Sequence, residues 1–228
     1  MRFNYQPRTP VSEQKSEARA EIGRKVWARL KAVEGIRIVE QRKAQVAVIN
    51  DFLDADTCAQ LCTRIDASNQ RSSAYTDSGI DDKRTSHSSN FRRDEPFIRD
   101  IELKMCDLLG LPEESGETMQ GQRYEPGQFF RPHPDFFQID APGWDTILKT
   151  GGQRTWTAMI FLNAPLSGGE TRFNNLGFQV KPAPGRLLTW NNMDEEGAPN
   201  PYTFHEGTDV IMGRKHIVTK WFREGRWV

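Results

Sequence analysis

The chain has 228 residues, which is enough for one well-buried domain with a helical extension and too few for two ordinary domains. Its 31 lysine and arginine residues balance 31 aspartate and glutamate residues, so charge gives no sign of a nucleic-acid or anionic-membrane partner. Three cysteines without disulfide spacing, and no apolar run of about 18 residues, predict an unexported protein of the reducing cytoplasm.

The first part of the chain predicts an amphipathic helix. Between Ser12 and Val33, apolar residues recur at steps of three and four positions, with arginine, lysine and glutamate between them. This pattern is typical of a helix that packs one face against a protein core. We therefore expect a helical extension over residues 1–43 and a single domain over residues 44–228.

A strand and two further helices are predicted next. Residues 44–53 are rich in apolar and β-branched side chains and read as a strand. Asp54 or Asp56 then provides an acidic cap for a helix. Another helix begins near Pro96, which suits a first helical turn, and ends at Gly110, which suits the left-handed conformation of a helix end.

The middle and the second half of the chain predict irregular and β structure. Residues 72–91 are rich in serine, aspartate and arginine without a sustained apolar period, so they read as a long loop. From Thr118 onward, segments such as TWTAMIFL, GRLLTW and HIVTKWF alternate with glycine, proline and asparagine turns. This half of the chain predicts a β-sandwich or a barrel.

Three residues of the predicted β-region have the chemistry of a metal site. His133 and Asp135 are two positions apart, so a strand would point both side chains to one face. An HxD pair alone is weak evidence, because it arises by chance in roughly one such chain in four. His205 comes much later, where another strand can carry it back across the barrel. Two imidazoles and one carboxylate can occupy one face of an octahedron.

This ligand set favours non-haem iron(II) over zinc. A facial triad leaves three coordination positions open, enough for a bidentate cosubstrate and dioxygen, whereas zinc prefers a closed or nearly closed tetrahedral set. Manganese, cobalt and nickel fit the same three ligands. Lys215 lies on a predicted strand shortly after His205, and a buried ammonium needs an anion. Either a protein carboxylate or the far carboxylate of 2-oxoglutarate would meet that need.

The segments between Met119 and Trp221 resemble the prolyl 4-hydroxylase branch of the 2-oxoglutarate/iron(II) oxygenases. MQGQRYEPGQFFRPHPDFF is similar to the first metal strand of that family, RTWTAMIFLN and GGETRF to the following pair, and HEGTDVIMGRKHIVTKW to the closing strands. The resemblance implies an α+β, mainly β fold. Its core is a double-stranded β-helix, jelly-roll or cupin-like, over about residues 116–228, with the N-terminal helices packed on one sheet.

The resemblance also implies roles for single residues. His133, Asp135 and His205 match the metal triad of the family, and Lys215 matches the residue that pairs with the distal carboxylate of 2-oxoglutarate. Iron(II), 2-oxoglutarate and O2 are therefore the expected cofactor and cosubstrates, with ascorbate as a reductant.

Further positions match the family with alternatives left open. Tyr124 and Thr171 match residues whose hydroxyls contact the cosubstrate, although a core tyrosine and a turn threonine explain them equally well. Phe161 stands where many relatives place a tyrosine, so a hydroxyl contact from that position is missing here.

The resemblance suggests a lid over the substrate. Arg84, Thr85 and Ser86 are similar to an RTS-like sequence that closes over a peptide in the family, with a solvated surface loop as the alternative. Trp221 is a candidate for substrate contact, although large aromatic residues more often belong to a core.

The activity implied by the resemblance is hydroxylation of a proline in a peptide or protein, with O2 consumed and succinate and CO2 released. No catalytic acid or base is required. Hydroxylation of a free amino acid or another small molecule by the same chemistry is the first alternative, and a non-catalytic β-barrel binding module is the second. No nucleic-acid or membrane partner is expected, and the oligomeric state, including a homodimer, stays open.

Overall fold

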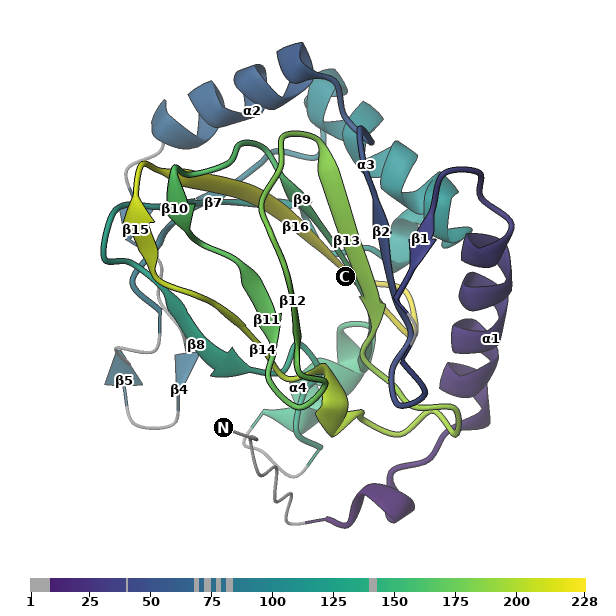
Figure 1. Cartoon of the computed structure of the whole chain (residues 1–228). Helices are drawn as coiled ribbons and strands as arrows, with labels where there is room; N and C mark the ends of the chain where they lie inside the picture. The colour runs from purple at the N-terminus through teal and green to yellow at the C-terminus, as the bar shows by residue number, and fades with distance from the viewer. Residues whose placement is uncertain are drawn as a thin grey trace.

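Two β-sheets face each other in the computed structural model of the chain, and helices α1, α2 and α3 cover the outer side of the larger sheet (Figure 1). The structure describes residues 9–39, 41–67, 84–139 and 143–228, together with the backbone of three short strands between residues 70 and 80. This arrangement agrees with the expected double-stranded β-helix with helices on one sheet.

The helices of the described residues are four α-helices and three short 3-10 turns. They are η1 (Val11–Glu13), α1 (Glu17–Lys31), α2 (Ala55–Ala67), α3 (Pro96–Leu109), η2 (Glu113–Ser115), α4 (Trp144–Lys149) and η3 (Pro201–Thr203). None of those within the described part of the chain combines the length and apolar composition that crossing a membrane requires.

The strands form two main sheets and two short pairs. The larger sheet has the order β1 (Arg37–Ile38), β2 (Val46–Ile49), β13 (Arg186–Asn191), β9 (Arg154–Phe161), β16 (Lys215–Arg223), β7 (Gln120–Tyr124), β6 (His87–Asn90) and β3 (Gln70–Arg71). The smaller sheet has the order β12 (Phe178–Val180), β11 (Thr171–Phe173), β14 (His205–Gly207) and β8 (Phe130–His133). The short pairs are β10 (Ser167–Gly168) with β15 (Val210–Met212), and β4 (Tyr75–Thr76) with β5 (Gly79–Ile80).

The helix ends follow from local capping. Helix α1 begins later than the apolar pattern predicts, because η1 forms a separate turn and the Ser16 hydroxyl accepts the Arg19 N–H at 3.4 Å. Asp54 caps α2 as predicted, since its carboxylate accepts the Thr57 N–H at 2.7 Å. Helix α3 has proline in its first turn and ends at Gly110, whose φ of 66° is left-handed, so both predicted ends are confirmed.

The prediction of one long loop over residues 72–91 was partly wrong. His87–Asn90 forms β6, which pairs with β7 in the larger sheet, and the backbones of β4 and β5 pair with each other. The serines and asparagine of β6 carry no apolar period, so its strand conformation comes from the ladder that β7 supplies. Residues 72–74, 77–78 and 81–83 lie outside the described residues.

The larger sheet separates two cores because side chains alternate along its central strands. On the helix side, buried residues of α1, α2 and α3 pack on apolar side chains of β9 and β16, such as Trp156, Ile160 and Val218. On the other side, Met159, Phe161 and residues of the smaller sheet fill part of the space between the sheets. A second set of side chains on the same strands therefore points into the interior that the two sheets enclose.

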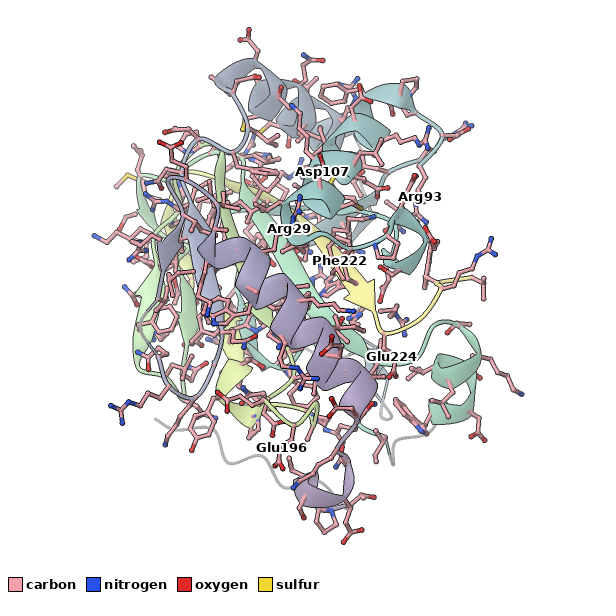
Figure 2. All side chains as sticks on the ribbon, turned by 90° about the vertical axis from the view of Figure 1, so that its right-hand side faces the viewer. Arg29, Arg93, Asp107, Glu196, Phe222 and Glu224 are labelled. Carbon is pink, nitrogen blue, oxygen red and sulfur yellow. The ribbon has the colours of Figure 1, made fainter. Side chains whose placement is uncertain are left out.

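Helix α1 is also fastened to α3 by a polar contact. Figure 2 shows α1 lying across the molecule with Arg29 reaching toward Asp107 at the end of α3. The Arg29 guanidinium Nε donates to the backbone carbonyls of Asp107 and Leu108 at 2.8 and 3.2 Å. These carbonyls belong to the last turn of α3, where the Asp107 carbonyl also accepts the Gly110 N–H at 3.2 Å, so Arg29 adds a cationic donor to that helix end and stabilises it.

A fully buried ion pair joins α3 to the larger sheet. Glu102 and Lys220 are both 0% exposed, and the Lys220 Nζ lies 3.1 Å from a Glu102 oxygen. The same carboxylate accepts the Met119 N–H at 2.7 Å and the Arg93 Nε at 3.2 Å, so its charge is met from three sides. Removing one member of such a set leaves the other charges buried without compensation.

Replacing Glu102 by leucine should therefore lower the free energy of unfolding by about 3–5 kcal/mol, because Lys220 loses its buried partner. Urea denaturation followed by circular dichroism measures the change. Lys15→Ala, which removes an exposed ion pair with Glu196, is the control and should cost less than about 1 kcal/mol. Equal losses for the two variants would contradict this account.

Candidate metal centre

A cluster of two histidines and one aspartate lies inside the β-sandwich. Strands β8 and β14 pair antiparallel with His205 opposite His133, and Asp135 follows two residues after the end of β8. One ligand atom from each of the three side chains can be chosen so that all lie within 4.8 Å of one another. The predicted triad residues are thus brought together from distant parts of the sequence.

The position of Asp135 differs from the expected one. The sequence predicted His133 and Asp135 on one strand, but β8 ends at His133 and Asp135 lies in the bend that follows. Pro134 stands between them and has no N–H to continue a ladder, which explains the early end of the strand. The bend after β8 brings the Asp135 carboxylate to the two histidines in place of the strand alternation that was expected.

The spacing and chemistry of the three side chains fit one divalent ion. The His133 Nε2 lies 3.9 Å from Asp135 Oδ1, and the His205 Nε2 lies 4.0 Å from Asp135 Oδ2. Two metal–ligand bonds of about 2.1 Å each can span these separations. Two imidazole nitrogens and one carboxylate oxygen, with no cysteine, form the donor set of a facial triad for non-haem iron.

Backbone carbonyls fix the tautomer of both histidines. His133 Nδ1 lies 2.9 Å from the Arg131 carbonyl, and His205 Nδ1 lies 3.0 Å from the Thr203 carbonyl. A carbonyl only accepts, so each neutral ring donates from Nδ1 and leaves the lone pair of Nε2 toward the centre of the cluster.

The protonation states also suit metal binding. Burial and the neighbouring His205 lower the pKa of His133 to about 3, so this ring is neutral at physiological pH. Burial alone would raise the pKa of Asp135, but His205, His133, Arg154 and a hydrogen bond from Thr157 together lower it. The cluster therefore offers a neutral imidazole and an ionised carboxylate.

Aromatic rings form a wall around the histidines. Phe130 stacks on His133 with ring centroids 3.5 Å apart, while Trp190 meets His205 edge-on at 4.7 Å. Phe173 lies beside His205 at 5.7 Å. This apolar packing restricts both ligand rings and limits the access of water to them.

Lys215 faces the same cavity and has no carboxylate partner there. Its side chain is 2% exposed, and no described carboxylate lies within ion-pair distance of its Nζ. The rings of Tyr124 and Phe161 face this ammonium, with centroids 5.2 and 5.4 Å from Nζ. Burial lowers the pKa of Lys215 to about 7, which Glu170 only partly opposes. A ligand carboxylate would remove this cost.

Space for a ligand is left beside that ammonium. A Cβ built on Gly207 would lie 3.8 Å from the Lys215 Nζ and 3.7 Å from Phe130. The missing side chain at Gly207 therefore keeps open the room between the lysine and the wall of the smaller sheet.

The structure collects most of the predicted site residues around this cavity. The cavity is lined by His133, Asp135, His205, Lys215, Tyr124, Thr171 and Trp221, among others. Tyr124 is buried, which raises its pKa, and its hydroxyl donates to Gln122 at 3.0 Å. Thr171 is 2% exposed on β11, so its hydroxyl lies inside the sandwich and is not part of a surface turn.

The predicted lid residues lie at the edge of the smaller sheet. Arg84 forms an isolated bridge with Phe130, and the Thr85 N–H donates to the Phe129 carbonyl at 3.2 Å. The Arg84 guanidinium lies over the Phe130 ring and donates to Ser86 at 2.9 Å. Ser86 is itself fully buried. The segment thus lies along the free edge of β8, the strand that carries His133 of the cluster.

Two polar residues near the cluster were missed by sequence reasoning. The Thr157 hydroxyl donates to Asp135 Oδ2 at 2.8 Å, and the Asn192 side-chain amide donates to that hydroxyl at 2.9 Å. Side chains alternate along the strand TWTAMIFL, so the sequence predicts that Thr157 shares a face with Met159 and Phe161. Nothing in the sequence tied that face to Asp135.

Comparisons with known proteins agree with this geometry. The family model described as the 2OG-Fe(II) oxygenase superfamily matches residues 119–223. Prolyl 4-hydroxylase 1 of Arabidopsis thaliana is 32% identical over an alignment of 225 positions, which covers 87% of this chain and 77% of that protein.

Two solved structures are similar as well. The viral collagen prolyl hydroxylase of Paramecium Bursaria Chlorella virus-1, in its 2OG complex, is 26% identical, with a TM-score of 0.63 over 78% of this chain and 95% of its own. A Trichoplax adhaerens prolyl hydroxylase bound to a hypoxia inducible factor peptide fragment is 16% identical, with a TM-score of 0.59 over 90% of both chains. The second likeness concerns the fold alone, and together they confirm the predicted fold.

Replacing His205 by alanine should weaken Mn²⁺ binding by more than about 100-fold, because loss of a direct ligand exceeds the 10- to 100-fold effect of losing a supporting contact. Titration of the metal-free protein, followed by electron paramagnetic resonance of free Mn²⁺, measures the affinity. Circular dichroism should show an unchanged fold. His87→Ala removes a histidine outside the cluster and should bind as the unaltered protein does; unchanged affinity in His205→Ala would rule out this metal centre.

Proposed function

The chain belongs to the 2OG-Fe(II) oxygenase superfamily, in its prolyl 4-hydroxylase-like branch, and on this premise we propose that it hydroxylates a proline residue within a peptide or protein. It is a 2-oxoglutarate-dependent dioxygenase that uses Fe(II), 2-oxoglutarate and O2. The observation that carries the proposal is the placement, around one cavity, of a histidine–aspartate–histidine cluster and a buried ammonium that pairs with no carboxylate of the described residues.

We propose that His133, Asp135 and His205 hold the iron and that Lys215 holds the distal carboxylate of 2-oxoglutarate. Both imidazoles donate from Nδ1 to a backbone carbonyl and so direct Nε2 to the metal position. Burial lowers the pKa of His133 to about 3, so this ring binds a cation without first losing a proton. The ammonium, in a site without a protein counter-ion among the described residues, favours a dicarboxylate cosubstrate.

Tyr124 and Thr171 are proposed to contact the same cosubstrate through their hydroxyls. Both line the cavity with Lys215, and both are almost completely buried. The phenol of Tyr124 stays protonated because burial raises its pKa. Its O–H, which donates to Gln122 in this structure, would turn to donate to a carboxylate of the cosubstrate.

When bound, iron and 2-oxoglutarate supply the oxidation itself, in which O2 is consumed, 2-oxoglutarate is converted to succinate and CO2, and a substrate C–H becomes C–OH. The protein holds and orients the reactants. Phe130 and Trp190 keep the histidine rings in place and exclude water, and Lys215 sets the direction in which the cosubstrate enters the cavity. No side chain needs to act as an acid or base.

The peptidic nature of the substrate is supported by the relatives and by the cavity rim. The Arabidopsis relative is a prolyl 4-hydroxylase and the viral one a collagen prolyl hydroxylase. Trp221 lines the cavity and is only partly buried, so its ring can meet a proline ring. We propose that Arg84, Thr85 and Ser86, on the edge of β8, border the bound peptide.

We also propose a reducing, cytoplasmic setting with ascorbate as a supporting reductant. Cys58, Cys62 and Cys106 are free thiols. Burial raises the pKa of Cys62 to about 12, and the pKa values of the other two are raised as well. Such thiols are structural and unreactive, which fits a chain that folds without disulfides.

Purified protein with Fe(II), ascorbate and 2-oxoglutarate should release succinate faster when a proline-containing peptide is present, and the peptide should gain one oxygen. Replacing Lys215 by alanine should abolish both, because the cosubstrate loses the one lysine or arginine among the described residues that line the cavity. Lys104→Ala, a surface change on α3, is the matched control. Mass spectrometry of the peptide and assay of succinate measure the two products.

The substrates tested decide between the alternatives. A gain of oxygen on free proline with none on any peptide would replace the peptide substrate by a small molecule. Release of succinate that does not depend on the metal would contradict the proposed activity. So would a protein that binds iron and 2-oxoglutarate but releases no succinate.

The affinity for 2-oxoglutarate should fall as pH rises above about 7. Without the ligand, burial lowers the pKa of Lys215 to about 7, so the amine is charged below that pH and neutral above it. The bound carboxylate raises this pKa again, so binding above pH 7 takes up a proton and weakens by up to about tenfold per pH unit. Calorimetric titration of the Mn²⁺-loaded protein between pH 6 and 9 measures the effect.

Lys215→Arg is the control for this pH dependence. Arginine keeps its charge throughout this range, so the variant should bind 2-oxoglutarate with an affinity that does not change with pH. A flat profile in the unaltered protein would show that Lys215 is charged at all these pH values and would contradict the prediction.

A further inference from the structure

The Asp135 carboxylate has two oxygens with different surroundings. Oδ2 accepts a hydrogen bond from the Thr157 hydroxyl at 2.8 Å, whereas Oδ1 accepts none from the described residues. Oδ1 lies 3.9 Å from the His133 Nε2, and Oδ2, the oxygen that accepts from Thr157, lies 4.0 Å from the His205 Nε2. The carboxylate is therefore held through one oxygen while the other is left free.

The direction of the Thr157 hydrogen bond is fixed by Asn192. The Asn192 side-chain NH2 lies 2.9 Å from the Thr157 Oγ1, and an NH2 group only donates. The hydroxyl thus accepts from Asn192 and has its single proton left for Asp135. Such a chain of donors polarises each successive bond and strengthens the last one.

The backbone of Asn192 is held by two hydrogen bonds, but only the NH2 group of its side-chain amide has a hydrogen-bond partner among the described residues. Its backbone N–H donates to the Thr155 carbonyl at 2.7 Å, and its carbonyl accepts the Asn200 N–H at 2.9 Å. The side chain is 0% exposed, yet its Oδ1 accepts no hydrogen bond from any described residue. A buried amide oxygen without a partner costs free energy, so stability alone does not explain this asparagine.

We infer that Asn192 and Thr157 are positioning residues, which turn the Asp135 carboxylate so that Oδ1 faces the metal position. The inference rests on the proposed role of Asp135 as an iron ligand. Asn192 directly follows β13, Thr157 lies on β9, and Asp135 lies in the bend after β8. This chain of hydrogen bonds therefore runs from the larger sheet to the smaller one. It holds the ligand in its binding orientation before the metal arrives.

A merely structural role would have a different signature. Thr189 supplies the comparison, because its hydroxyl donates to the Thr157 backbone carbonyl at 2.7 Å and is 0% exposed. Thr189 lies on β13, which leads directly to Asn192, but its hydroxyl donates to the Thr157 backbone and forms no hydrogen bond with Asp135. Its removal disturbs the same strands without reaching the carboxylate.

The test is Mn²⁺ binding by the metal-free protein, without 2-oxoglutarate and without turnover. Thr157→Val removes the hydroxyl at nearly constant volume and should weaken binding by about 10- to 100-fold. Asn192→Leu keeps that hydroxyl but frees it to rotate, and should weaken binding by a smaller factor. Thr157→Ser restores the donor and should bind nearly as the unaltered protein does, as should Thr189→Val.

Electron paramagnetic resonance of free Mn²⁺ gives the affinities, and thermal unfolding of the metal-free variants reports their stability. Asn192→Leu and Thr157→Ser keep the test decisive if Thr157→Val does not fold. Unchanged affinity in Asn192→Leu and Thr157→Val, or an equal loss in Thr189→Val, would overturn the inference while leaving the iron site intact. Failure of the unaltered protein to bind Mn²⁺ better than Asp135→Ala would instead overturn the proposed iron site itself.

Discussion

The candidate site depends on the register between β8 and β14. Their antiparallel pairing sets His205 opposite His133, although the two residues are far apart in the chain. Because side chains alternate along a strand, a shift by one residue would turn one imidazole out of the interior and separate the pair. The carbonyl that fixes the tautomer of His133 belongs to Arg131 within β8, whereas the one for His205 belongs to Thr203 at the end of η3, just before β14. One strand pairing thus determines the positions of two ligands, and the carbonyl two residues before each ligand determines its donor atom.

Alternation along β16 gives two lysines opposite roles. Lys220 points to the helices and is paired with Glu102 at 3.1 Å, so its charge serves packing. Lys215 points to the cavity, where its ammonium has aromatic neighbours but no carboxylate at ion-pair distance among the described residues. Both side chains are almost completely buried, and the main difference lies in which groups surround the charge. A buried lysine with a protein partner supports the fold, whereas one without invites a ligand.

Local patterns predicted the parts of the molecule that local chemistry determines. The caps at Asp54 and Gly110 follow from a few neighbouring residues. Pro134 indicates that the strand ends at His133, but the HxD pattern favoured a strand that continues to Asp135. Strand β6 and the contacts of Thr157 and Asn192 were not predictable, because they depend on partners brought from distant strands by the sheet register.

The two kinds of ligand in the cluster are held by different means. A histidine on a paired strand is positioned by its backbone, and a carbonyl two residues earlier is enough to orient its ring. Asp135 lies beyond Pro134, outside the ladder, so its carboxylate depends on side-chain contacts for its orientation. Thr157 provides that contact from β9, and Asn192 determines which way the Thr157 proton points. The carboxylate is therefore the ligand whose geometry is most open to change by substitutions elsewhere in the sandwich.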